Sequence, residues 1–146
     1  ERAMGALPPT FNRREHVHDS ARTPPNRFAH HRLDAYRVAL DLVVGVESLR
    51  FPPGFADHRD QLRRAAAATV RHIAEGANRA HPRDKASRFM VARGEVGECE
   101  AALQMAEALG LAPATSTRPL RILADRVAAM LRGLIRRQLA DADPPG

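Results

Sequence analysis

The chain has 146 residues and a formal net charge of +6, and all of its 23 basic residues except Lys85 are arginine. This length suffices for one domain whose core needs no disulfide or metal ion, and the single cysteine, Cys99, excludes an intrachain disulfide. One free cysteine fits a reducing compartment, and no apolar run reaches the length of a transmembrane helix. We therefore expect a cytoplasmic protein with no membrane partner.

Residues 1–32 are expected to form a flexible tail. They contain four prolines, scattered charge and little apolar periodicity. Such a segment cannot bury enough apolar surface to offset the entropy lost on ordering. Its four histidines (His16, His18, His30 and His31) are not expected to bind a metal, because nothing in the sequence holds them in a fixed geometry.

Two helices are predicted in the next part of the chain. The first covers about 34–49 and is followed by Pro52, since proline disfavours helical geometry in the residue before it. The second covers about 57–80, with Asp57 as its N-cap and a last turn weakened by Gly76. The apolar face of the first helix is predicted to contain Tyr36, Leu40, Val43 and Val44.

Two further helices complete the pattern. The third is predicted at about 82–109 and begins with Pro82, which the first turn of a helix tolerates. Its apolar residues recur in alternating steps of three and four, which is the seam of left-handed bundle packing: Phe89, Ala92, Val96, Cys99, Leu103, Ala106 and Gly110. The fourth is predicted at about 119–140, after the potential N-caps Thr115, Ser116 and Thr117, with an inner face of Leu120, Leu123, Val127, Met130, Leu131 and Leu134.

The sequence therefore predicts an all-α protein. There is no sustained alternation of apolar and polar residues and no Asn-Gly hairpin turn that would indicate strands. Four amphipathic helices joined by short connections predict an antiparallel up-down-up-down four-helix bundle over residues 33–140. Residues 141–146 are expected to form a short C-terminal tail.

The titratable residues do not form a recognisable catalytic or metal-binding motif. None of the four predicted helices carries the Glu-x-x-His pattern of di-iron bundles, and the glycine-rich phosphate loops are missing. His72 has no evident catalytic partner, and Cys99 falls on the third-helix seam, where a buried apolar role is expected. We expect a protein that is not an enzyme and has no cofactor or metal.

The arginines carry the remaining chemistry. Guanidinium groups bind phosphate in a bidentate manner, and six basic side chains on the second and third helices are predicted to contact nucleic acid: Arg64, Arg71, Arg79, Arg83, Lys85 and Arg88. Ion pairing between subunits is an equally weighted explanation. The i,i+4 pairs Glu75–Arg79 and Asp84–Arg88 are expected to offset part of this charge. A second basic patch is predicted on the fourth helix, at Arg126, Arg132, Arg136 and Arg137.

One combination of motifs resembles a known family. It consists of Gln61-Leu62-Arg63-Arg64-Ala65, then Ile73-Ala74-Glu75-Gly76, Arg79 and Arg88-Phe89. The chain resembles the four-helix-bundle proteins encoded in intervening sequences of bacterial 23S rRNA genes, which are related to the accessory variability determinant (Avd) of diversity-generating retroelements. The resemblance implies a ring-like homopentamer, a basic surface that binds RNA or DNA, and a reverse transcriptase as a partner. It also implies structural or subunit-interface roles for Arg63, Glu75, Gly76 and Phe89.

Two hypotheses follow from these observations. The first is a homo-oligomeric accessory protein, with a pentamer as the expected assembly, that binds nucleic acid and assists a reverse transcriptase. The alternative is a structural or adaptor bundle whose arginines contact other subunits or a protein partner. The low aromatic content of 4% argues against recognition by base stacking, so nucleic-acid binding is expected to rest on phosphate contacts.

Overall fold

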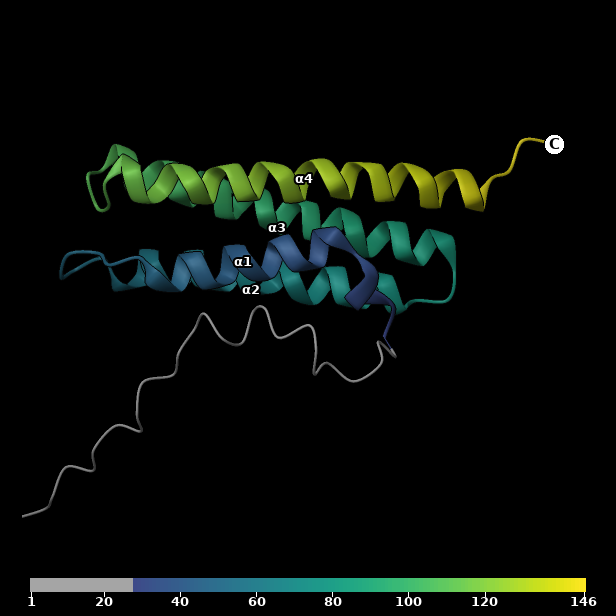
Figure 1. Cartoon of the computed structure of the whole chain (residues 1–146), viewed down its shortest axis with the longest axis horizontal. Coiled ribbons are helices and arrows are strands. Elements are labelled where there is room, and N and C mark those ends of the chain that lie inside the picture. The colour runs from purple at the N-terminus through teal and green to yellow at the C-terminus, as the bar shows by residue number, and fades with distance from the viewer. Residues whose placement is uncertain (1–27) are drawn as a thin grey trace, which may run out of the picture.

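The computed structural model describes residues 28–146, which form one short 3-10 helix and four α-helices (Figure 1). Their bounds are η1 (Ala29–Arg32), α1 (Asp34–Ser48), α2 (Ala56–Asn78), α3 (Pro82–Ala108) and α4 (Ala114–Ala142). Successive helices run in opposite directions and are joined by short connections, and the described residues contain no strand. The predicted antiparallel four-helix bundle is confirmed. Of the tail predicted for residues 1–32, residues 1–27 lie outside the described residues.

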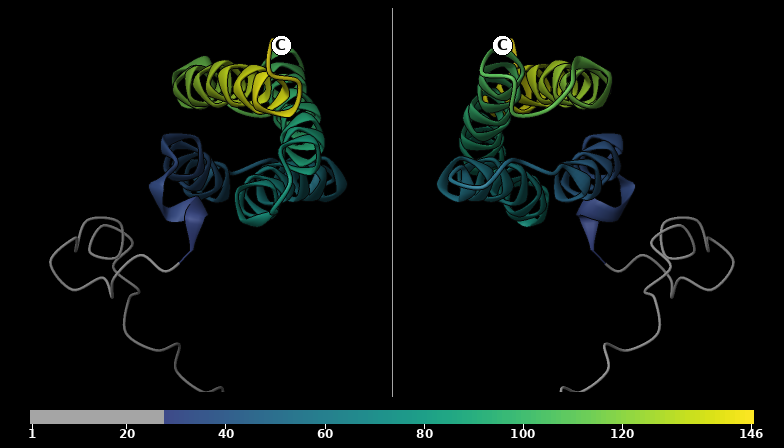
Figure 2. Two further views of the ribbon diagram at one scale, coloured as in Figure 1. Left: turned by 90° about the vertical axis from the view of Figure 1, so that its right-hand side faces the viewer. Right: turned by 90° about the vertical axis from the view of Figure 1, so that its left-hand side faces the viewer.

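The four helices occupy the corners of a square when the bundle is viewed along its length (Figure 2). Each helix packs against its neighbours in the sequence, and α1 closes the arrangement by packing against α4. The contacts of α3 with α2 and with α4 are the most extensive. The core therefore lies along the central axis, and α3 is the helix that holds the two halves of the bundle together.

The predicted seam of α3 is correct except at its last member. Phe89, Ala92, Val96, Cys99, Leu103 and Ala106 are all buried in the core. Gly110 is exposed and lies beyond the helix end, with a φ of +68°. Its amide donates to Glu107 O, and the Leu111 amide donates to Ala106 O. These two bonds form a Schellman motif, which explains why glycine occurs at this position.

The predicted inner face of α1 is wrong in part. Leu40 and Val44 are 39% and 40% exposed, whereas the buried residues of this helix are Ala35, Val38, Ala39, Leu42 and Val46. The sequence of α1 carries apolar residues on more than one face, so periodicity alone did not select the buried one. The choice depends on the packing of α4 against α1. Gly45 lies so close to Leu120 that a Cβ atom at this position would clash with the leucine side chain.

Two predicted helix starts also differ from the structure. Phe55 occupies the N-cap of α2. Asp57 lies in the first turn, where the helix dipole stabilises its negative charge. The fourth helix begins at Ala114 rather than near Pro119, so the expected N-caps lie inside it. The buried Thr117 hydroxyl donates to Glu107 Oε2 at 2.9 Å, which ties the start of α4 to the end of α3.

The fold also includes residues 29–32, which the sequence analysis assigned to the tail. The Ala29 amide donates to Asn78 Oδ1 at 3.2 Å, and Asn78 Nδ2 lies 2.8 Å from His30 Nδ1. The His30 ring packs against Tyr36 with a centroid distance of 4.6 Å. Amide and aromatic contacts of this kind dock η1 onto the end of α2, and apolar periodicity does not reveal them.

The docking of η1 is expected to weaken in acid. Burial, with a smaller effect of His31, lowers the pKa of His30 below its ordinary value of 6.5. The unfolded segment therefore takes up a proton at a higher pH than the docked one, and stability falls as the pH drops through 6.5 and below. Protonated His30 also cannot accept the Asn78 amide hydrogen. Hydrogen exchange at Ala29 and Leu33, corrected for intrinsic rates, should show loss of protection over this range. An unchanged pH profile in His30→Gln would contradict the explanation.

Candidate nucleic-acid interface

Arg64 and Arg71 lie two turns apart on the exposed side of α2. They line two grooves, one against α1 with a volume of about 420 Å³ and one against α3 with a volume of about 580 Å³. Neither side chain forms an ion pair with another residue in the described range 28–146. These two predicted contacts are therefore exposed cations on a ridge between two grooves, and we call Arg64 and Arg71 the α2 ridge.

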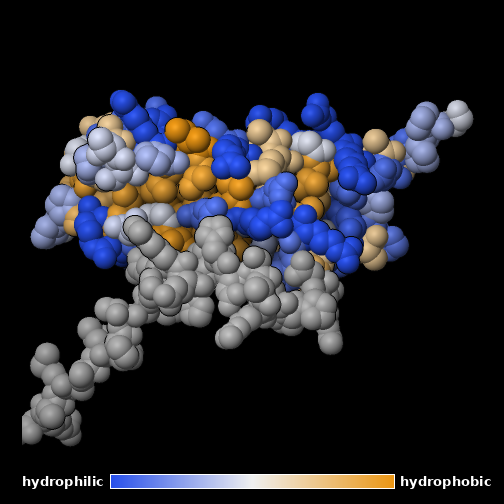
Figure 3. All heavy atoms as spheres, viewed as in Figure 1, coloured by the Kyte–Doolittle hydropathy of each residue, from blue (hydrophilic) through white to orange (hydrophobic). Residues whose placement is uncertain are grey.

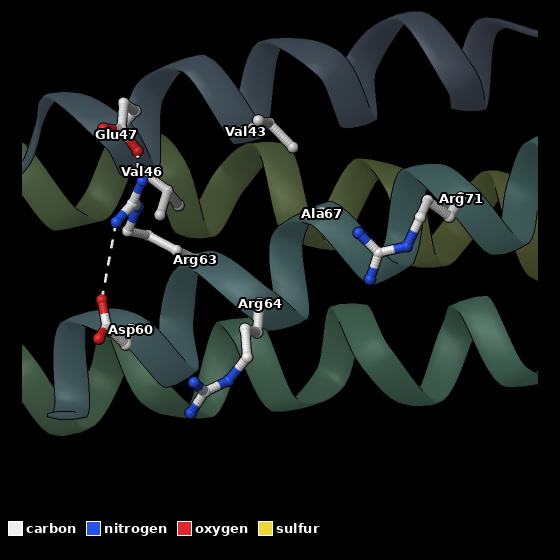
Figure 4. Close-up of a pocket in the computed structure, with 8 residues that line it drawn as sticks. All are labelled: Val43, Val46, Glu47, Asp60, Arg63, Arg64, Ala67 and Arg71. Atoms are coloured by element: carbon white, nitrogen blue, oxygen red, sulfur yellow. Dashed lines mark hydrogen bonds and ion pairs between the residues drawn. The ribbon is translucent and has the colours of Figure 1, made fainter.

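The neighbouring Arg63 has a different environment. Its Nε lies 2.7 Å from Glu47 Oε2, and its guanidinium also lies 3.6 Å from Asp60. Figure 4 shows Arg63 directed towards these two carboxylates, whereas Arg64 points away from α1. Arg63 thus links α2 to the end of α1, in keeping with the structural role that the family resemblance implies.

The other four predicted contacts meet at the turn between α2 and α3, but each already has a partner. Arg79 and Arg88 both pair with Glu75, the latter at 3.5 Å. Lys85 Nζ donates to Ala77 O at 3.2 Å. Arg83 pairs with Asp143 at the end of α4. The expected Glu75–Arg79 pair is confirmed. The expected Asp84–Arg88 pair is wrong, because Arg88 reaches back to Glu75 on the facing helix.

The cluster at the turn between α2 and α3, which we call the α2–α3 corner, carries little net charge. The four basic side chains share this part of the bundle with three carboxylates, those of Glu75, Asp84 and Asp143, which leaves a formal charge of +1. The hydrogen bond from Arg79 lowers the pKa of Glu75, and the charges of Arg88 and His72 act in the same direction. His72 Nδ1 lies 3.6 Å from Glu75 Oε2. The corner is thus better suited to holding α2, α3 and α4 together than to binding an external anion.

Packing beneath the corner depends on a glycine. Gly76 is buried inside α2, and a Cβ atom added there would lie 2.8 Å from Phe89 Cε1. The helix continues past it to Asn78, and the missing side chain of Gly76 permits the close approach of α3. The structure thus places Glu75, Gly76 and Phe89 together in the contact between α2 and α3.

A third hollow contains arginines that were not among the six predicted contacts. It has a volume of about 530 Å³, lies between α3 and α4, and is lined by Arg93, Ala129, Arg132, Ile135 and Arg136. The sequence placed Arg132 and Arg136 in a patch on one helix. It gave no direct sign that Arg93 joins them, since that depends on the register between α3 and α4. Arg126 and Arg137, the other members of that patch, do not line this hollow.

Within residues 28–146, no group of three or more His, Cys, Asp and Glu side chains is arranged to hold a metal ion. In the same range, none of the helices combines the length and the apolar character needed to span a membrane.

The Cys99 thiol is expected to be unreactive in the folded protein. The residue is fully buried, and burial raises the pKa of its thiol to about 12. Only the thiolate reacts readily with disulfide reagents. At about pH 8, native protein should therefore react far more slowly than protein unfolded in denaturant. Rapid stoichiometric labelling of the native protein would show that α3 opens readily.

Comparison with known proteins supplies the family. A search of curated proteins returned no match. The model of the 23S rRNA-intervening sequence protein family matches residues 31–133, which extend from η1 into the second half of α4. The match covers most of the bundle, including the α2–α3 corner and the Gly76–Phe89 contact. The chain belongs to the 23S rRNA-intervening sequence protein family.

Proposed function

We propose that this protein is a non-enzymatic accessory protein that binds nucleic acid through phosphate contacts. The observation that supports this proposal most strongly is the exposure of Arg64 and Arg71 without a carboxylate partner in the described bundle. Each guanidinium would neutralise a phosphate and release its counterion. Binding would then be sensitive to salt and weakly dependent on sequence, because phosphates carry no sequence information directly.

The six contacts predicted from the sequence do not contribute equally to this proposal. Arg79, Arg83, Lys85 and Arg88 would have to exchange a partner in the bundle for a phosphate. Arg64 and Arg71 require no such exchange. The proposal therefore assigns the larger share of phosphate binding to the α2 ridge and the smaller share to the α2–α3 corner.

The finer parts of the proposal rest on the resemblance stated for the motifs of α2 and α3. By that resemblance the protein would form a homo-oligomer, with a ring of five subunits as the first expectation. The single free cysteine is the reason for expecting it in the cytoplasm. A relationship to the accessory variability determinant of retroelements would make a reverse transcriptase its protein partner. The family name refers to an intervening sequence in 23S rRNA, and an rRNA-related role is the corresponding alternative.

The test is a mobility-shift titration with Arg64→Gln/Arg71→Gln. Glutamine keeps the helix propensity while it removes both charges. The slope of log affinity against log salt should become shallower by about 0.9 for each lost contact on duplex DNA. The control is Arg37→Gln/Arg118→Gln, which has the same charge change but removes exposed cations that are paired with Asp34 and Glu107. Equal slopes in the two variants would rule out a specific role for the α2 ridge.

A structural or adaptor role is the second candidate, and two surfaces favour it. The α2–α3 groove has Arg64 and Arg71 on one rim and Glu95 and Glu98 on the other, with alanines between them. This arrangement would suit a helix of complementary charge. An apolar band also follows the face on which α1 and α4 lie side by side (Figure 3), and Leu40, Val44 and Ile122 are exposed on these two helices.

Charge reversal separates the two candidates. Under the nucleic-acid proposal, Arg64→Glu/Arg71→Glu should weaken nucleic-acid binding and leave the native mass unchanged. Under the adaptor proposal, the same variant should change the native mass, because like charges would then face each other across the subunit contact. Native mass spectrometry before and after nuclease treatment gives both readouts on one sample.

A further inference from the structure

The charged residues between α3 and α4 follow a regular register, with one exception. Glu107 pairs with Arg118 at 3.6 Å and with Arg121 at 3.5 Å, and Glu100 pairs with Arg121 at 2.7 Å. Moving fourteen residues from Glu107 back along α3, and fourteen from Arg118 forward along α4, leads to Arg93 and Arg132. Because the two helices are antiparallel, these residues lie at the same level of the hairpin. The register that elsewhere joins acid to base here places arginine beside arginine.

The helices supply no local counter-ion to these arginines. Arg136 lies one turn beyond Arg132 and lines the same hollow with Arg93, and we call these three residues the guanidinium groove. Positions three and four residues away on the same helix are the ones that face a side chain. Apart from the arginines themselves, these positions around the groove hold only uncharged residues, and none is a carboxylate. They are Phe89, Met90, Val96, Gly97, Ala128, Ala129, Gly133, Ile135, Leu139 and Ala140.

The lining of the groove contains no carboxylate. Its two uncharged residues are Ala129 and Ile135. Within residues 28–146, none of the three arginines forms an ion pair. Three carboxylates lie seven residues from a member of the groove, or about 10 Å along a helix axis, which is close to the screening length of physiological salt: Glu100, Asp125 and Asp143. Glu100 and Asp143 are already paired with Arg121 and Arg83. Arg132 and Arg136 are like charges four residues apart, a spacing that destabilises a helix, so an external anion is the simplest means of balancing them.

The structure points to the phosphate backbone of a nucleic-acid duplex as the ligand of the guanidinium groove, and we propose this assignment, which rests on the function proposed above. A duplex carries one phosphate charge per about 1.7 Å of its axis, whereas each of its strands alone carries one per about 3.4 Å. Proteins that hold single strands add aromatic side chains on which bases stack. No aromatic residue lines this groove, so it matches the charge of a backbone and offers nothing to an unpaired base.

The experiment compares Arg93→Gln/Arg132→Gln with the wild type and with the control Arg37→Gln/Arg118→Gln. All three proteins carry residues 1–146 and are treated with nuclease before purification. The probes are a blunt RNA duplex and an unstructured RNA strand of the same length, titrated by fluorescence anisotropy at several salt concentrations. Thermal unfolding and native mass are measured on each protein, so that a change in fold or assembly is detected separately.

We expect the wild type to prefer the duplex and the groove variant to bind the duplex about tenfold more weakly. The slope of log affinity against log salt should become shallower by about 1.8 for two lost phosphate contacts, on the B-DNA coefficient of about 0.9 for each contact. The groove variant should unfold at the same temperature as the wild type or slightly higher, because a like-charge contact is removed. The control should keep most of the affinity.

Other outcomes overturn the assignment in distinguishable ways. If the groove variant binds like the wild type, the groove is not the site, although the proposed function stands. Equal losses in the groove variant and the control would show that bulk charge alone matters. Preference for the single strand would refute the duplex assignment, and a change in native mass would identify the groove as a subunit contact. A wild type that binds neither probe would refute the proposed function as well.

Discussion

Replacing Phe89 by alanine is expected to lower the free energy of unfolding by about 3–5 kcal/mol. Phe89 is the largest of the fully buried side chains, with 2% of its surface exposed, and it packs in the contact between α2 and α3. Its removal would leave a cavity that the surrounding helices fill only in part, since protein interiors are close-packed. Urea unfolding followed by circular dichroism, at one fixed protein concentration, measures the change.

The control for this prediction is the next residue. Met90 is 47% exposed, so Met90→Ala should change the stability by no more than about 0.5 kcal/mol. Equal effects of the two substitutions would mean that the α2–α3 contact is not formed as described. A fixed protein concentration is needed because self-association would add to the apparent stability.

Gly76→Ala is expected to lower the stability by roughly 1–2 kcal/mol. The new methyl group would lie 2.8 Å and 2.9 Å from two atoms of the Phe89 ring and 3.1 Å from Arg88 Cβ. Overpacking of this kind costs about 1–3 kcal/mol, and the better helix propensity of alanine offsets about 0.5–1 kcal/mol of it. The ring cannot move aside freely because Phe89 is buried in the core.

A second glycine provides a matched control with the opposite sign. Gly97 lies in the interior of α3, and a Cβ atom added there meets nothing within 4 Å. Gly97→Ala should therefore stabilise the protein by about 0.5–1 kcal/mol. If Gly76→Ala also stabilised the protein, helix propensity would outweigh the contact and the close approach of α3 would be refuted. Combining Gly76→Ala with Phe89→Leu should cost less than the two single changes together, because leucine leaves room for the methyl group.

Much of the fold could be predicted from the sequence because one helix carries a regular pattern. The buried residues of α3 recur in steps of three and four, although the helix also has apolar residues that are exposed, such as Met90, Val91 and Met105. The first helix has apolar residues on several faces, and the position of α4 decides which of them are buried. The contact between Gly45 and Leu120 joins residues far apart in the chain, and no local pattern contains it.

The candidate site was less accessible to sequence reasoning for a related reason. Local ion pairs such as Glu75–Arg79 follow from helical spacing. The partners of Arg83 and Arg88 are supplied by other helices, as Asp143 on the loop after α4 and Glu75 on α2 show. Arginines that look free in the sequence can therefore be paired in the fold. Arg93 shows the reverse case, since only the register of α3 against α4 reveals that it lies beside Arg132.

The most direct test of the proposed function is the binding of nuclease-treated wild-type protein to a labelled RNA duplex as the salt concentration is varied. We expect association at low salt, with an affinity that falls linearly in a plot of log affinity against log salt. A protein that stays unbound to the duplex even at the lowest salt concentration would contradict the account, and its exposed arginines would then have to serve contacts between proteins.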